Sequence, residues 1–143
     1  ANVYGLVGGE PNAIAPAKRP LSSMSPTFVE DEQGVLVLGT PGGSRIVSMV
    51  LLGILDYLHN PAWTLDGMVA APRFHHQFLP DRVEIEPEGF PAAWRTALED
   101  RGHTVSVARR PWGNMQAVHV EHRSGRAQAA ADPRGQPQPV PAF

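Results

Sequence analysis

One turn, at residues 39–45, constrains this chain more than any other feature. Its sequence Gly-Thr-Pro-Gly-Gly-Ser-Arg follows the apolar run at residues 35–38 and leads into a second apolar run that begins at Ile46. This order predicts a strand, a tight turn and a buried helix. Because glycine accepts positive φ and a helix start leaves N–H groups unpaired, Gly42 and Gly43 would present backbone amides to an anion or a developing oxyanion.

A Gly-Gly pair between a strand and a helix is most often a simple turn, and the sequence alone leaves this possibility open. A phosphate-binding loop would need Gly-Lys-Ser/Thr, whereas Gly43 is followed by Ser44 and Arg45, and the Gly-x-Ser-x-Gly pattern of a nucleophilic serine is also absent. We expect Ser44 to cap the helix with its hydroxyl and Arg45 to pair with a carboxylate.

A second stretch, at residues 18–27, places three hydroxyls between Pro20 and Pro26. The two prolines exclude a helix. The adjacent Ser22 and Ser23 offer two hydroxyls and two backbone amides to one ligand group, an arrangement that can hold a carboxylate without a neighbouring cation. A solvated turn is the alternative interpretation of this stretch taken alone.

Four stretches in this order resemble the small subunit of bacterial γ-glutamyltranspeptidases: residues 2–9, 18–27, 41–45 and 71–77. The Asp-Pro-Arg sequence at residues 132–134 resembles the closing motif of that family. The resemblance therefore extends over nearly the whole chain.

Two pairs of residues match the family's functional positions. The resemblance implies that Ser22 and Ser23 bind the α-carboxylate of the γ-glutamyl donor, and that Gly42 and Gly43 form the oxyanion hole. Members of the family begin the small subunit with a threonine freed by autoproteolysis, whose hydroxyl attacks and whose amine acts as base. Ala1 does not match this threonine, so we expect the nucleophile to belong to a segment upstream.

The resemblance implies an α+β fold, a four-layer αββα sandwich of the N-terminal-nucleophile hydrolase type to which this chain contributes part. Residues 1–134 would form the C-terminal portion of the catalytic small subunit, and residues 135–143 an extended proline-rich tail. The implied partners are the large subunit and the N-terminal part of the small subunit of the same precursor, in the periplasm or secreted. No metal or organic cofactor is implied.

The implied activity is cleavage of γ-glutamyl amides such as glutathione through a γ-glutamyl-threonine ester, with transfer to water or to an amino acid or peptide acceptor. Two alternatives remain. One is a cephalosporin-type acylase on the same scaffold, which would not need a carboxylate clamp. The other is a non-catalytic scaffold subunit whose glycines only turn the chain.

Composition limits the function classes further. The 143 residues, 42% hydrophobic, suffice for one domain with a core. A formal charge of −2, from 12 basic and 14 acidic residues, gives no basic footprint for nucleic acid. The absence of cysteine excludes a disulfide framework, a thiolate zinc site and a cysteine nucleophile.

Periodicity predicts strands and helices along the rest of the chain. We expect the strand at residues 35–38 to be covered on both faces and the helix at residues 44–59 to be buried nearly all round, because both are apolar at almost every position. Later strands should be antiparallel and should face helices. The expected elements are strands at 27–29 and 35–38, helices at 44–59, 64–71 and 91–102, and strands at 103–107, 115–122 and 126–129. We expect Thr64 to cap the second of these helices and Gly102 to cap the end of the third.

Histidine and tryptophan side chains offer further candidates. Adjacent His75 and His76 cannot share a face of a strand or helix, so we interpret them as loop anchors rather than metal ligands. His119 and His122 should point to opposite faces of one strand. Trp112 either lines the mouth of a substrate cleft or plugs a surface turn.

The acids at 84, 86 and 88 alternate with other residues in an extended segment. Paired carboxylates can carry glycoside hydrolysis when their environments differ. Three acids on one side more simply form a solvated edge, and we expect Glu84, Glu86 and Glu88 to be exposed together.

Overall fold

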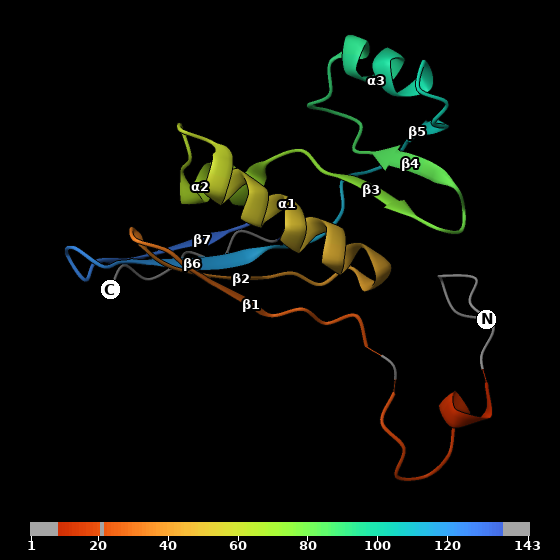
Figure 1. Ribbon diagram of the computed structural model, residues 1–143, viewed down its shortest axis with the longest axis horizontal. Helices are drawn as coiled ribbons and strands as arrows, with labels where there is room; N and C mark the ends of the chain where they lie inside the picture. The colour runs from red at the N-terminus through yellow and green to blue at the C-terminus, as the bar shows by residue number, and fades with distance from the viewer. Residues whose placement is uncertain (1–8, 21, 136–143) are drawn as a thin grey trace.

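The computed structural model describes residues 9–20 and 22–135 and shows two β-sheets with helices packed against them (Figure 1). The larger sheet has the strand order β1-β2-β6-β7 and is antiparallel throughout. The smaller sheet has the order β3-β4-β5. The elements in chain order are η1 (Glu10–Asn12), β1 (Thr27–Glu30), β2 (Gly34–Gly39), η2 (Gly43–Arg45), α1 (Ile46–His59), α2 (Leu65–Ala70), β3 (Phe74–Gln77), β4 (Arg82–Ile85), α3 (Ala92–Glu99), β5 (Val105–Val107), β6 (Gln116–Glu121) and β7 (Ala127–Ala131).

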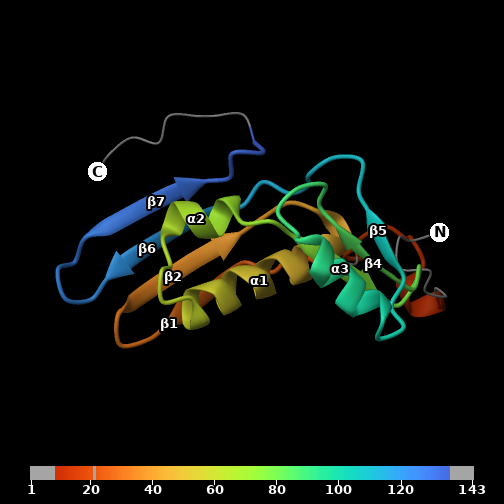
Figure 2. The same ribbon diagram turned by 90° about the horizontal axis from the view of Figure 1, so that it is seen from above.

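The larger sheet is built on β2, whose side chains alternate between the two faces. Leu36 and Leu38 are buried on the face that α1 and α2 cover, and they pack there with Met49 and Met115. Figure 2 shows α1 and α2 lying over this sheet. The main core of the chain therefore lies between one sheet face and two helices.

Close approach of α1 to the sheet depends on Gly53. A Cβ atom at this position would lie 2.8 Å from Leu38 Cδ1, and the next contacts would be with the Met115 side chain. A glycine inside a helix costs roughly 1 kcal/mol relative to alanine. Here it allows the helix backbone to approach β2 closely.

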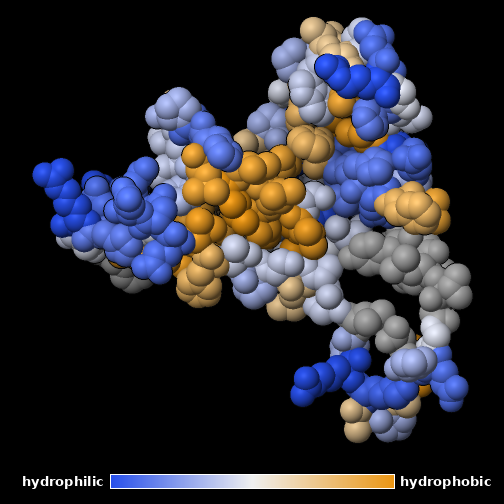
Figure 3. All heavy atoms as spheres, in the orientation of Figure 1, coloured by the Kyte–Doolittle hydropathy of each residue, from blue (hydrophilic) through white to orange (hydrophobic). Residues whose placement is uncertain are grey.

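The expectation that α1 is buried nearly all round is wrong within this chain. Met49, Val50 and Tyr57 are buried, but the opposite side of the helix exposes large apolar side chains. Figure 3, in the orientation of Figure 1, shows hydrophobic side chains gathered at the surface where α1 lies. The exposed apolar residues of α1 are Val47, Leu51, Leu55 and Leu58.

The larger sheet also has one face that no described helix covers. The register pairs Phe28 with Val37 and Val37 with Val118, so these three side chains share that face. Phe28 is 74% exposed, Val118 is exposed, and Val37 is only half-buried. The prediction that β2 is covered on both faces therefore holds for only one face in this chain.

The smaller sheet has a separate core. Val83, Ile85 and Val105 are buried, and α3 packs against them with Trp94 and Leu98. β4 and β5 run parallel to each other, so the expectation of antiparallel strands only is wrong for this pair. A parallel pair needs a crossover, and α3 provides it between β4 and β5.

Several local expectations are confirmed. Thr64 caps α2, because its Oγ1 accepts a hydrogen bond from Gly67 N at 3.1 Å. Gly102 follows α3 with φ of +88°. His119 is buried and His122 is exposed, as expected for opposite faces. Ser44 is different: it lies inside η2, and no side-chain cap is found at the start of η2 or α1.

The His119 side chain belongs to a polar cluster at one end of the core. The Tyr57 hydroxyl donates a hydrogen bond to Asp31 Oδ1 at 2.8 Å and lies 3.5 Å from His119 Nε2. Burial, followed by the bond to the Asp31 carboxylate, raises the pKa of Tyr57 to about 12. The tyrosine is therefore a neutral donor, which anchors α1 to the β1–β2 hairpin.

Two expectations fall outside the described residues. These are the first stretch of the family resemblance, nearly all of which lies in residues 1–8, and the proline-rich tail, which lies in residues 136–143 apart from Gly135. Within the described residues, no helix combines the length and apolar character needed to cross a bilayer.

Candidate functional site

The turn at residues 39–45 connects β2 to α1 through the short helix η2. Gly43 has φ of +59°, a left-handed conformation that favours glycine. At Gly42 a Cβ atom would lie only 2.4 Å from Met49 Cε. Among the described residues, neither Gly42 N–H nor Gly43 N–H donates a hydrogen bond. The two adjacent N–H groups at this turn are thus unpaired within the described residues.

The serine stretch reaches the same turn. Ser23 Oγ donates a hydrogen bond to the Gly43 carbonyl at 2.7 Å. Ser22 is exposed, and its Oγ accepts a hydrogen bond from Met24 N at 3.1 Å. The structure therefore brings Ser23 to Gly43, which lies 20 residues later in the sequence, whereas neither serine lines the hollow beside the glycines.

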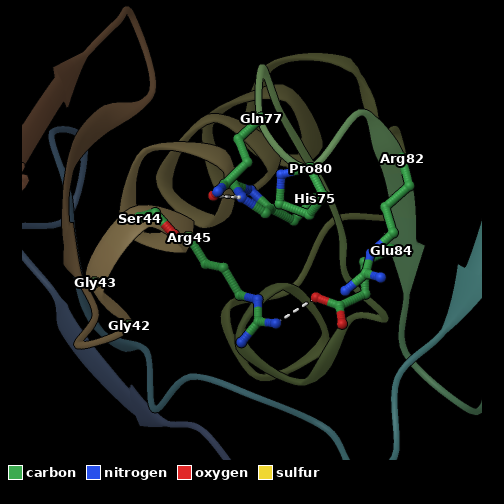
Figure 4. A pocket seen from close by; sticks show the side chains of 9 residues that line it. All are labelled: Gly42, Gly43, Ser44, Arg45, His75, Gln77, Pro80, Arg82 and Glu84. Atoms are coloured by element: carbon green, nitrogen blue, oxygen red, sulfur yellow. Dashed lines mark hydrogen bonds and ion pairs between the residues drawn. The ribbon is translucent and has the colours of Figure 1, made fainter. Parts of the chain in front are cut away.

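A hollow of about 310 Å³ opens beside the two glycines (Figure 4). Its other walls come from η2, from β3 and β4, and from Pro80 between these two strands. His75 is buried, and its ring nitrogens lie 2.7 Å from Ser48 Oγ and 2.9 Å from Gln77 Oε1. The residues that line the hollow are Gly42, Gly43, Ser44, Arg45, His75, Gln77, Pro80, Arg82 and Glu84.

The interpretation of His75 and His76 as loop anchors is wrong in one respect, because both lie on strand β3. Their side chains do point to opposite faces. His75 is buried against α1, whereas His76 is exposed and lies 2.9 Å from Asp81 Oδ1. Each histidine therefore anchors a different neighbour, and the two do not converge on one site.

Arg45 crosses the hollow from the end of η2. Its guanidinium forms an ion pair with Glu84 on β4, which confirms the predicted carboxylate partner (Figure 4). The same guanidinium lies 4.7 Å from the centre of the Trp112 ring. This residue thus links the diglycine turn to both the smaller sheet and the segment before β6.

Trp112 lies in the wall of a larger hollow next to the first. Its side chain is buried, with one face under the Arg45 guanidinium. Its main-chain N–H donates to Glu86 Oε1 at 2.9 Å, and its carbonyl accepts from Arg73 Nη1 at 2.6 Å. Of the two positions left open by the sequence, the structure favours a wall of the cleft.

A buried ionic cluster supports that wall from behind. Arg73 and Asp132 pair at 2.5 Å, and Arg134 pairs with Glu86 at 2.6 Å and with Asp132 at 3.1 Å. Arg73, Glu86 and Asp132 are each no more than 3% exposed. Burial by itself would raise the pKa of Asp132, but the N–H groups of Met115 and Arg134 and the Arg73 guanidinium lower it below its ordinary value.

The expectation of an exposed acidic edge is therefore wrong for Glu86. Glu88 is exposed and Glu84 is half-buried, whereas Glu86 lies inside the cluster. The strand β4 ends at Ile85, and Glu86 N–H then donates to the Arg73 carbonyl at 3.0 Å. The Glu86 carboxylate therefore lies buried, and there it pairs with Arg134, 48 residues later in the sequence.

The cluster is the part of the site that sequence reasoning missed. The stretch around Arg73 and the Asp-Pro-Arg sequence that contains Asp132 and Arg134 both carried the family resemblance, but no spacing linked them to each other or to Glu86. The pairing was not predictable locally, because charged residues are buried in this way only when partners distant in sequence come together.

The described part of the chain is thus a mixed α and β unit in which unpaired backbone amides, the Ser23 hydroxyl and an arginine-lined cleft lie near the end of β2. The family model for γ-glutamyltranspeptidases matches residues 1–142. This chain belongs to the γ-glutamyltranspeptidase family.

Several curated relatives carry the name glutathione hydrolase proenzyme, and two of them illustrate the similarity. The chain is 46% identical to the one from Escherichia coli strain K12 over 137 residues, which is 93% of this chain and 22% of the relative. It is 42% identical to the one from Pseudomonas aeruginosa over 141 residues, 94% of this chain and 24% of the relative. The chain therefore spans about a fifth to a quarter of the length of these relatives.

Solved structures give the same family. The chain is similar to an acivicin-inhibited γ-glutamyltranspeptidase, with a TM-score of 0.82 and 42% identity over 94% of this chain and 72% of that one. It is also similar to the γ-glutamyltranspeptidase from Pseudomonas nitroreducens complexed with L-DON, with a TM-score of 0.82 and 36% identity over 100% of this chain and 74% of that one.

The lowered pKa of Asp132 predicts a loss of stability in acid. The carboxylate is stabilised in its ionised form, so its contribution is present above the unfolded pKa of about 3.9 and is lost as the pH falls through the folded value. We expect the melting temperature of the complete protein to fall on acidification below about pH 4. Thermal unfolding followed by circular dichroism across this range is the measurement, and a melting temperature that stays constant there would contradict a stabilising role for the ionised carboxylate.

Proposed function

We propose that this chain supplies the second half of a γ-glutamyl transfer site, in which Gly42 and Gly43 form the oxyanion hole and Ser22 and Ser23 hold the carboxylate of the donor. The observation that carries the proposal is the pair of unpaired N–H groups at Gly42 and Gly43, on a turn that Ser23 contacts directly. Membership of the family and the names of the relatives support the same chemistry.

The proposed reaction begins with an N-terminal threonine contributed by an upstream segment. Its hydroxyl oxygen attacks the γ-carbonyl carbon, and the hydroxyl proton passes to the threonine amine. The carbonyl oxygen becomes an oxyanion, which accepts hydrogen bonds from Gly42 N–H and Gly43 N–H. Preorganised donors of this kind contribute about 3 kcal/mol each to transition-state stabilisation in well-studied enzymes.

Collapse of this intermediate breaks the bond between the γ-carbon and the amide nitrogen. The leaving amine takes the proton from the threonine amine, and a γ-glutamyl ester remains on the threonine oxygen. Water or an acceptor amine then attacks the ester carbonyl, and the oxyanion forms again at the same two amides. The product leaves as glutamate or as a new γ-glutamyl amide, and the threonine hydroxyl is restored.

Donor recognition is assigned to the serine pair. Ser23 Oγ–H now donates to a neutral carbonyl, and a carboxylate would offer it a stronger, charged acceptor. The Ser22 hydroxyl is exposed and only accepts a bond from Met24 N, so its proton is available to a ligand. The carboxylate of a γ-glutamyl group is the ligand group that this arrangement fits.

Removal of both hydroxyls tests this assignment. We expect Ser22→Ala with Ser23→Ala to raise KM for glutathione at least tenfold, because each hydrogen bond to a charged group contributes roughly 1.5–3 kcal/mol. Steady-state kinetics of the complete two-chain protein is the measurement. Ser124→Ala is the matched control, since this exposed serine lies in the β6–β7 turn and should leave KM unchanged.

The outcome also separates the alternatives. An unchanged KM in the double variant would favour an acylase that needs no carboxylate clamp. Absence of turnover of a chromogenic γ-glutamyl anilide by the complete two-chain protein, with its N-terminal threonine intact, would instead favour a non-catalytic subunit and would overturn the enzyme assignment.

The proposed partners are the other parts of the same precursor, which mature by autoproteolysis. The uncovered sheet face around Phe28, Val37 and Val118 would pack against a second sheet, and the exposed side of α1 would be covered as well. A second sheet on this face and a further helical layer beyond it would complete the four-layer αββα sandwich. The proposed location is the periplasm or the cell exterior.

A further inference from the structure

The larger hollow, of about 800 Å³, adjoins the diglycine hollow. The two share Arg45, Arg82 and Glu84 in their walls, so the Arg45–Glu84 ion pair borders both. A ligand whose reacting carbonyl sits at Gly42 and Gly43 can therefore extend past this pair into the larger space. The residues that line the larger hollow are Arg45, Arg82, Glu84, Ser106, Val107, Ala108, Arg109, Arg110, Pro111, Trp112, Gly113 and Arg134.

This hollow carries an excess of positive charge. Five of its lining residues are arginines and one, Glu84, is acidic. Arg45 is paired with Glu84, and Arg134 is paired with Glu86 and Asp132.

Three guanidinium groups of this hollow have no ionic partner in the described part of the chain. Within the described residues, the side chains of Arg82, Arg109 and Arg110 form no ion pair. In a chain whose formal charge is −2, this local excess of positive charge favours an anionic ligand.

The segment that carries Arg109 and Arg110 is held at both ends. On one side, Ala108 N–H donates to the Ile85 carbonyl at 2.8 Å and so continues the pairing of β5 with β4. On the other side, the main chain of Trp112 is fixed by Glu86 and Arg73. The two arginines therefore extend from a fixed backbone, which lowers the entropy cost of binding a ligand.

We propose that Arg109 and Arg110, together with Arg82 in the wall of the same hollow, bind the free carboxylate of the amine part of the substrate. This inference rests on the proposed function. Guanidinium groups match carboxylates with paired N–H donors. An amino acid or short peptide that leaves as an amine carries such a carboxylate a few bonds from the scissile nitrogen.

The same subsite would serve the acceptor. An acceptor amine attacks the γ-glutamyl ester along the path that the leaving amine followed, because the transfer step is chemically the reverse of acylation. An acceptor amino acid or peptide then places its own carboxylate where that of the leaving group was. The arginines would therefore select amines that carry a carboxylate over those that lack one.

A comparison of two donors tests the inference in the complete two-chain protein. Glutathione has a leaving group with a carboxylate, whereas γ-glutamyl-p-nitroanilide has one without. We expect Arg109→Ala with Arg110→Ala to lower the ratio of kcat/KM for glutathione to that for the anilide about tenfold. Arg109→Lys with Arg110→Lys, which keeps the charge, should recover part of this ratio.

Arg123→Ala serves as the control, because this exposed arginine lies in the β6–β7 turn, away from both hollows. It should leave the ratio unchanged. An unchanged ratio in the double alanine variant, or an equal loss for both donors, would overturn the inference while the proposed function stands. Absence of turnover of both donors by the unsubstituted protein would instead remove the proposed function, and the inference with it.

A second measurement needs no substitution and guards against a variant that fails to fold. In the unsubstituted protein, glutathione should have a kcat/KM about tenfold above that of glutathione whose glycyl carboxylate is converted to an amide. The same preference should hold between glycylglycine and its amide as acceptors. Equal values for the acid and the amide would overturn the inference.

Discussion

Replacing Gly43 by valine is expected to lower kcat roughly a hundredfold or more in the complete two-chain protein, with a smaller change in KM. Gly43 has φ of +59°, a conformation that a β-branched residue strongly disfavours. The substitution therefore forces the turn into another conformation and moves the Gly43 N–H away from the position where the oxyanion develops. Because that donor acts mainly in the transition state, the loss should appear in kcat rather than in substrate binding.

The matched control is Gly125→Val in the β6–β7 turn. Gly125 has φ of +69°, and a Cβ atom there, as at Gly43, would meet nothing within 4 Å. The two substitutions impose a similar backbone strain, but only one lies at the proposed site. Equal activity losses in both variants would show that strain alone causes the effect, and a Gly43 variant with normal kcat would contradict the oxyanion assignment.

Replacing Asp132 by alanine is expected to cost about 3–5 kcal/mol of the free energy of unfolding. Asp132 is 2% exposed and pairs with both Arg73 and Arg134, so its removal leaves the buried Arg73 guanidinium without its carboxylate. It also removes the acceptor of Met115 N–H, which lies 3.0 Å from Asp132 Oδ2. Urea denaturation of the complete protein measures the change.

Glu99→Ala provides the comparison for this prediction. Glu99 pairs with Arg95 on the surface of α3, where both side chains are exposed. Such a pair contributes roughly 0.2–1 kcal/mol, so its loss should be several times smaller than that of Asp132. Similar losses in the two variants would mean that the buried cluster does not hold the structure together as described.

Much of the fold could be predicted from local patterns. The β1–β2 hairpin, the helix α1 and the cap at Thr64 follow from periodicity and capping chemistry, which act between residues close in sequence. The turn at Gly42 and Gly43 was predictable for the same reason. The resemblance implied that Ser23 and Gly43 serve one site, but the hydrogen bond between them was not predicted, since no local rule joins these two segments.

Long-range electrostatics limited the prediction elsewhere. The alternation of acids at residues 84–88 indicated one exposed edge, but Glu86 leaves the strand pattern and meets Arg134, 48 residues later. Its inward position depends on the Arg73 carbonyl and on the arrangement of Trp112, neither of which is encoded near Glu86. Strand periodicity predicts which face of a sheet a side chain occupies only within the strand, and β4 ends at Ile85, one residue before Glu86.

The apolar patterns of β2 and α1 were informative in a different way. They predicted burial on both sides, and this chain covers only one side of each. An apolar pattern predicts that a segment is buried in the complete protein, but it does not show which chain covers it. For the same reason, the sequence could indicate a layered sandwich while the described residues contain one sheet face that is uncovered.

The amides of Gly42 and Gly43 are central to the proposed function, because they complete a pocket whose attacking hydroxyl lies on another segment. The most direct measurement is a crystal structure of the complete two-chain protein with a γ-glutamyl analogue attached to its threonine. We expect the oxygen on the γ-carbon to lie about 2.7–3.1 Å from both nitrogens. An oxygen that points away from Gly42 and Gly43, toward other donors, would contradict the oxyanion hole proposed for this chain.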